Sequence, residues 1–109
     1  MPMSFPAGPA GGETVIVTAS GTVAVLPGQE TLVWQPAAPV GPVDFLLPAA
    51  PGLNETHVFK AQLATPGPTM QVTPAAGHTI EGKPYWVGVQ PDDGISLKWV
   101  GGGLWIIMP

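Results

Sequence analysis

The sequence contains no cysteine and no arginine, and its only basic side chains apart from histidine are three lysines. Without cysteine the chain has neither disulfides nor thiolate metal ligands. Charged residues make up 9% of the 109 residues, against about 25% in ordinary soluble domains. Nucleic acids and anionic membranes are bound by clusters of basic side chains, whereas the net charge here is −4. We therefore expect neither of them as a partner.

The scarcity of charge also bears on self-association. A small domain with so few charged groups has little to keep a free surface soluble and monomeric. The simplest remedy is that other subunits cover much of that surface. We therefore expect a homo-oligomer held together by apolar contacts.

Long apolar runs and helical periodicity are missing as well. No stretch approaches the roughly 20 apolar residues of a membrane helix. The first residues lack the charged segment and apolar run of a secretory signal, so none is expected. No segment of useful length shows the 3.6-residue period of an amphipathic helix.

Glycine and proline, in contrast, are abundant, at 15 residues each. That share alone is typical of disordered chains, but hydrophobic residues make up 45% of the sequence, and disordered chains are poor in them. Many short strands joined by Gly/Pro turns reconcile the two observations. We predict a single all-β domain, a small sandwich or barrel-like unit of about nine or ten strands.

Apolar and β-branched runs bounded by turn residues mark the expected strands. Gly21 splits the first long run, and we interpret it as a tight turn or bulge. Residues 91–94, Pro-Asp-Asp-Gly, are typical of a type I turn. The expected strands are residues 13–20, 22–26, 30–35, 43–47, 56–63, 70–73, 79–80, 85–90, 95–100 and 104–108.

Two proline-rich segments organise the N-terminal part of the chain. Residues 36–42 cannot pair as a strand of a sheet, and we expect them to form a strap that runs across the domain. They mark the boundary between an attachment half, residues 13–42, and a second half, residues 43–109. Residues 1–12 are either a frayed tail or an extended arm lying on a neighbouring subunit. The low charge favours the arm, whose apolar anchors would be Met3 and Phe5.

The last part of the chain, residues 95–108, is predicted to form a hairpin at the centre of the core. Alternate residues of 95–99 are apolar, which is the period of a half-buried strand. Three glycines at 101–103 allow the chain to reverse, because glycine adopts positive φ without steric cost. The returning run, 104–108, is apolar throughout, so we expect cover on both of its faces. The residues that define this core hairpin are Leu97, Trp99, Gly102, Trp105 and Ile107.

Paired acids and histidines are the first candidates for chemistry. General acid–base work needs two carboxyls in different environments of one cleft, whereas Asp92 and Asp93 are adjacent residues of a turn sequence. A metal site needs three or four converging ligands. His57 and His78 could contribute to one only with carboxylates, or as three symmetry copies of one histidine on a trimer axis. We predict neither catalysis nor a metal site.

The remaining motifs also argue against catalysis and cofactors. Ser4, Ser20 and Ser96 lack the strand-to-helix elbow of a nucleophile. The glycines at 101–103 lack the Lys-Ser/Thr pair and following helix of a phosphate-binding loop. A glycosylation sequon begins at Asn54, and we attribute it to chance. We expect no catalytic residue and no cofactor.

The order of motifs in the second half resembles a module of tailed bacteriophages that recurs in head-fibre, capsid-decoration and tail-fibre proteins. The stretches LPAAPG, MQVTPAAG, TIEG and ISLKWVGGGLWII follow one another here as in that module, over residues 43–108. Trp99 is bulkier than usual, and three glycines replace one polar turn residue. The matching residues are Leu47, Pro48, Val72, Pro74, Thr79, Ile80, Gly82, Leu97, Gly102 and Trp105.

The resemblance implies a structural virion protein, commonly trimeric and without catalysis. We expect a capsid decoration, or cement, protein that binds the major capsid protein on the outer head surface as a trimer and stabilises the shell. One alternative is a tail-fibre or receptor-binding tip. Another is a small carbohydrate-binding module, in which exposed tryptophans, from Trp34, Trp86, Trp99 and Trp105, would stack on sugar rings; we expect these tryptophans to be core residues.

Overall fold

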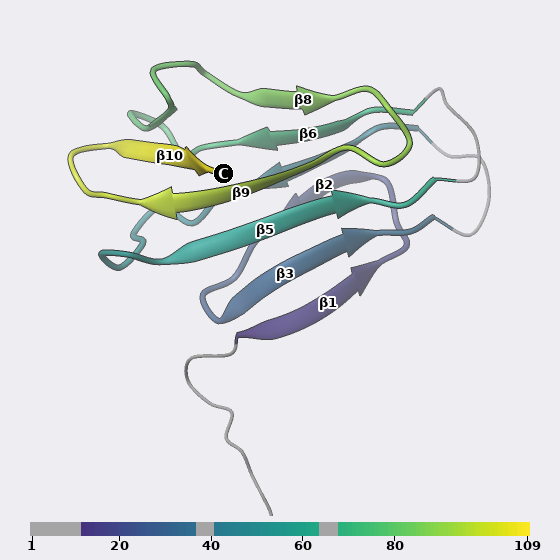
Figure 1. The fold of residues 1–109 in the computed structure, drawn as a ribbon, viewed down its shortest axis with the longest axis horizontal. Helices are drawn as coiled ribbons and strands as arrows, with labels where there is room; N and C mark the ends of the chain where they lie inside the picture. Colours follow the sequence, from purple (N-terminus) through teal and green to yellow (C-terminus); the bar gives the residue numbers. More distant parts are fainter. Residues whose placement is uncertain (1–11, 37–40, 64–67) are drawn as a thin grey trace, which may run out of the picture.

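A computed structural model describes residues 12–36, 41–63 and 68–109. These residues form ten strands and no helix, in agreement with the predicted fold class and strand number (Figure 1). No helix long and apolar enough to cross a membrane occurs among them. The strands are β1 (Glu13–Val17), β2 (Gly21–Ala24), β3 (Gln29–Trp34), β4 (Val43–Leu46), β5 (Thr56–Ala61), β6 (Met70–Thr73), β7 (Thr79–Ile80), β8 (Trp86–Gly88), β9 (Gly94–Trp99) and β10 (Leu104–Met108).

The ten strands form two sheets, one with the order β1-β3-β5-β9-β10-β7 and one with the order β2-β4-β6-β8. The first six strands alternate between these sheets along the chain. β1, β3 and β5 are parallel neighbours in one sheet, and β2, β4 and β6 are parallel neighbours in the other. The first part of the domain is therefore wound as in a β-solenoid. After these six strands, β8 is added to the smaller sheet antiparallel to β6, and β9 is added to the larger sheet antiparallel to β5.

The segment around Gly21 does not make a hairpin turn. Residues 18–20 carry the chain from the end of β1 to the other sheet, and Gly21 begins β2 with a φ of 87°. The indole nitrogen of Trp34 donates to the carbonyl of Ala19 at 2.8 Å, which ties this crossing to β3. The run that the sequence analysis divided at one glycine thus supplies strands to two different sheets.

The core lies between the two sheets, where the inward side chains of alternate positions meet. In β5, burial alternates residue by residue, as expected for a strand with one covered face. Phe45 of β4 and Phe59 of β5 are fully buried and join the layers, with ring centroids 5.2 Å apart. Burying one such side chain stabilises the fold by about 1.5–3 kcal/mol. Other fully buried members of this core are Leu32, Trp34, Val43, Met70, Val72, Ile80, Leu97 and Trp105.

The predicted C-terminal hairpin is present as β9 and β10, which pair antiparallel with Trp99 opposite Trp105. Leu97 and Trp105 are fully buried, and Trp99 is 8% exposed. All three loop glycines have positive φ, and Gly102, at 65°, is the tip of the loop. The hairpin contributes to the core without being its centre, because β3, β4, β5 and β6 also bury large side chains, among them Trp34, Phe45 and Phe59.

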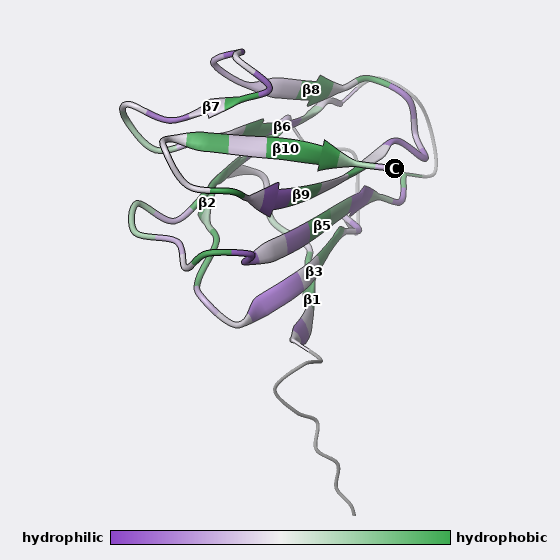
Figure 2. Cartoon of the chain, turned by 60° about the vertical axis from the view of Figure 1, so that its left-hand side comes forward, coloured by the Kyte–Doolittle hydropathy of each residue, from purple (hydrophilic) through white to green (hydrophobic). Residues whose placement is uncertain are grey.

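The expectation that β10 is covered on both faces is wrong for the described chain. Ile107 is 42% exposed, and Ile106 and Met108 are only partly buried. Figure 2 shows β10 as an apolar strand at the front of its sheet. Its neighbour β7 pairs only with Leu104 and Trp105, so the sequence pattern overstated how much of the strand a single copy can bury.

The Thr-Ile-Glu-Gly motif forms a two-residue reverse turn that closes the edge beside β10. Glu81 and Gly82 have φ values of 51° and 82°, the left-handed pair that such a turn requires. Ile80 and Lys83 exchange backbone hydrogen bonds of 2.9 and 2.8 Å across it. The Glu81 carboxylate accepts a hydrogen bond of 2.8 Å from the Ile107 amide and so extends the short pairing of β7.

Candidate functional site

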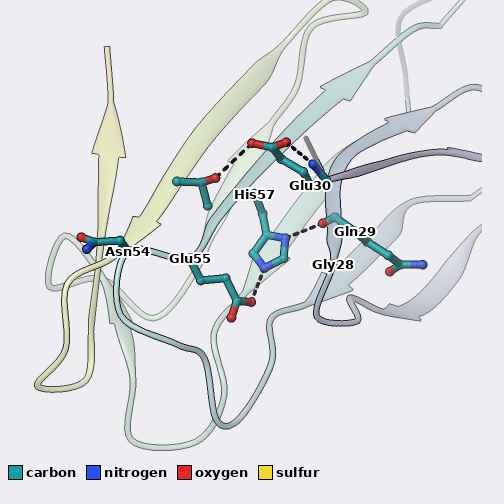
Figure 3. Close-up of a pocket in the computed structure, with 8 residues that line it drawn as sticks. Gly28, Gln29, Glu30, Asn54, Glu55 and His57 are labelled. Carbon is teal, nitrogen blue, oxygen red and sulfur yellow. Dashed lines mark hydrogen bonds and ion pairs between the residues drawn. The ribbon is translucent and has the colours of Figure 1, made fainter. Parts of the chain in front are cut away.

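A polar hollow of about 250 Å³ lies where β3 and β5 begin (Figure 3). It contains two carboxylates and a histidine, which makes it the first place to look for chemistry. Gln29 and Glu30 come from the start of β3, and Thr56 and His57 from the start of β5. Its lining residues are Gly12, Gly28, Gln29, Glu30, Asn54, Glu55, Thr56 and His57.

His57 is held from both sides of its ring. Nε2 lies 2.6 Å from Oε2 of Glu55, and Nδ1 lies 2.6 Å from the carbonyl oxygen of Gln29. A carbonyl oxygen can only accept, so Nδ1 donates to Gln29, while the Glu55 carboxyl group occupies Nε2. Both ring nitrogens of His57, which is 1% exposed, are therefore engaged within the protein.

The two carboxylates are equally occupied. Glu55 accepts from the backbone amide of Gly52 at 2.9 Å through its other oxygen. Glu30 accepts from the Gly12 amide at 2.9 Å and from the Thr56 hydroxyl at 3.2 Å. These bonds join the segment before β1 to the starts of β3 and β5. The hollow is therefore a hydrogen-bonded junction between successive coils.

The sequence analysis did not identify this junction. Its local signal is the spacing of Glu55 and His57, because residues two apart in an extended chain lie on the same face. The partner Gln29 could not have been identified in this way, since it is distant in the chain.

The other residues considered for chemistry are dispersed. Asp93 accepts from the amides of Val89 and Gln90, both at 2.9 Å, and so stabilises the turn before β9. The ring of His78 packs against Trp99 in a tilted arrangement, with centroids 4.6 Å apart. Within residues 12–36, 41–63 and 68–109, no group of three or more His, Asp or Glu side chains could hold a metal ion.

The tryptophans separate into three core residues and one at a surface hollow. Trp34, Trp99 and Trp105 are buried, which leaves them no face for a sugar ring. Trp86 is partly buried and, with Ile107, lines a mainly apolar hollow of about 400 Å³ beside the end of β10. This hollow could receive an apolar side chain, and the polar side chains in its lining are those of Lys60 and Ser96.

The attachment residues proposed from sequence, Met3 and Phe5, lie outside the described residues, as does part of the strap at 37–40. Leu97 and Trp105 lie in the core, Gly102 lies in the loop, and Ile107 lies at the rim of the apolar hollow. In comparisons with known proteins, neither a family model nor a curated protein matches this chain.

Proposed function

We propose that this chain is a non-enzymatic structural protein of a tailed-phage particle, a capsid decoration protein that binds the major capsid protein on the outer head surface as a homotrimer. The observation that carries the proposal is the ordered series of motifs from Leu47 to Trp105. The apolar members of that series are core residues, among them Leu47, Val72 and Ile80. Its glycines at 82 and 102 occupy left-handed turns. The motifs thus belong to one folded unit, as a shared structural module requires.

The surface is consistent with a protein that works by contact. Ile16, Leu26 and Ile107 are among the exposed large apolar residues, at 54%, 55% and 42%. The polar groups of the junction at His57 and Glu55 bond to one another and to the backbone, which is in keeping with a structural role. A decoration protein stabilises a shell by bridging capsid subunits and burying apolar area, and salt has little effect on such contacts because screening acts on charges.

The test is the location of the protein in purified virions of the phage that encodes it. Heads and tails are separated and each is analysed by mass spectrometry. We expect the chain in the head fraction, and we expect heads stripped of it to lose their DNA at a lower temperature than decorated heads. Its presence only in tails would favour the tail-fibre alternative, and its absence from both fractions would overturn the proposal.

A further inference from the structure

The two ends of the sheet pair differ in how their edge strands are protected. At one end the edge strands are β1 in the larger sheet and β2 in the smaller sheet, and at the other they are β7 and β8. In the described part of the chain, β1 pairs only with β3 and β2 only with β4. Figure 1 shows β1 as the outermost strand of its sheet. We call this double edge, formed by β1 and β2, the β1/β2 end.

The opposite end is closed by features that prevent strand addition. β7 and β8 contain only two and three residues, and very short edge strands offer little to a partner. The Glu81 carboxylate occupies the Ile107 amide, and the Asp93 carboxylate occupies the amides of Val89 and Gln90. At this end, carboxylate side chains therefore accept the hydrogen bonds of backbone amides that an added strand would otherwise use.

The β1/β2 end has less of this protection: β1 and β2 contain five and four residues, and a side chain, that of Gln29, occupies the amide of Leu26 just after β2. No charged residue lies between Glu13 and Glu30, and neither strand contains proline or lysine, the usual protections of an edge. The side chain of Ile16 is 54% exposed. The one charge on this double edge is Glu13 at the first position of β1, and edges rich in β-branched residues pair readily with another strand.

The hydrogen-bonding groups of this end point outward. The Val17 carbonyl accepts from the Gln35 amide, and the peptide groups of successive residues in a strand face opposite sides. Those of Thr14 and Ile16 therefore face away from β3. In β2 the amides of Gly21 and Val25 donate to the chain beside β4.

The same alternation turns the peptide groups of Thr22 and Ala24 away from β4. The end thus presents two rows of unpaired backbone groups, one on each sheet, about 10 Å apart, which is the usual spacing of packed sheets.

We propose that the β1/β2 end pairs with the same end of a second copy of this chain. A single extended peptide, including the proline-rich residues 1–11, could cover only one of the two edges. A second copy presents two edges with the same separation. A two-fold axis perpendicular to the sheets places β1 against the partner's β1 and β2 against the partner's β2, antiparallel in both sheets, and closes the assembly.

This contact does not rest on the proposed function and uses a different symmetry from the trimer. Acting alone, it gives a dimer. If the three-fold contact of the proposed trimer also forms, the two contacts together give six copies. In either case, loss of the β1/β2 contact halves the mass of the assembly.

The test compares the full-length chain with the double variant Ile16→Lys, Ala24→Lys by light scattering after size-exclusion chromatography. Both side chains are exposed, so the variant is expected to fold, and circular dichroism checks this. Charged edges oppose pairing. The matched control is Val89→Lys, at a residue 55% exposed beside β8.

We expect the mass of the double variant to be half that of the wild type and the mass of the control to be unchanged. Amide exchange gives a second measurement, in which the outward amides of Thr14 and Thr22 are protected in the wild type and lose this protection in the variant. A wild-type monomer, or a trimer whose mass the double variant leaves unchanged, would overturn the proposed contact. A dimer that the variant splits would support the contact while removing the trimer.

Discussion

His57 and Glu55 form a partly buried pair at the start of β5, with Nε2 and Oε2 2.6 Å apart, the His57 side chain 1% exposed and that of Glu55 18% exposed. Because the other ring nitrogen contacts the Gln29 carbonyl, this pair links two coils of the fold. Its arrangement is that of a structural junction.

Replacing Glu55 by alanine should destabilise the fold by about 1–3 kcal/mol, because it leaves a buried ring nitrogen without a partner. Urea denaturation measures the loss. Glu13→Ala, at an exposed residue of β1, is the control and should change stability little. Equal stability of the two variants would show that the Glu55 contact is dispensable.

Trp105→Ala should cost on the order of 3–5 kcal/mol, the range for large-to-small substitution of a buried aromatic residue. Trp105 is fully buried, whereas Ile107 on the same strand is 42% exposed. Ile107→Ala is therefore the control, with a smaller expected loss. Thermal or urea unfolding of both variants tests the assignment, and comparable losses would contradict the role of Trp105 in the core.

Gly102→Val should destabilise the hairpin through backbone strain alone. Its φ is 65°, and no atom lies within 4 Å of the position that a Cβ would occupy. Forcing a β-branched residue into this region costs of order 1–3 kcal/mol. Gly41→Val is the control, because that glycine is equally open and its φ is not in the left-handed region. Equal unfolding temperatures would refute the strain argument.

Glu81→Ala should free the Ile107 amide from its 2.8 Å contact and lower stability by about 1 kcal/mol. Glu81→Gln retains an acceptor oxygen and should lose less. Hydrogen exchange at Ile107 distinguishes the two variants, with faster exchange expected only for alanine. Unchanged protection in the alanine variant would show that another group satisfies this amide.

Deletion of residues 1–11 should leave a folded protein that binds its particle more weakly. Proline-rich segments lose less entropy when they dock, and Met3 and Phe5 are the apolar anchors in this one. Gly12, which donates to Glu30, is retained. Co-sedimentation with particles lacking the protein measures binding, and circular dichroism checks the fold. Unchanged binding would assign the attachment surface to other residues, and unfolding would show that the segment belongs to the core.

The local pattern of residues was sufficient to predict the all-β class and the approximate positions of the strands. Period-two alternation and turn residues are local properties, so the β9–β10 hairpin and its glycine loop could be predicted from neighbouring residues. The burial of Leu97 and Trp105 followed from the same pattern.

Which strands are neighbours could not be predicted in this way and became clear from the folded structure. Alternation states that a strand has two faces, but not which other strand lies beside it. The crossing at residues 18–20, the parallel pairing of β1 with β3, and the contact between His57 and Gln29 all join residues distant in the chain. The exposure of Ile107 has the same origin, because cover for an apolar face comes from packing against another element, which the composition of a strand does not specify.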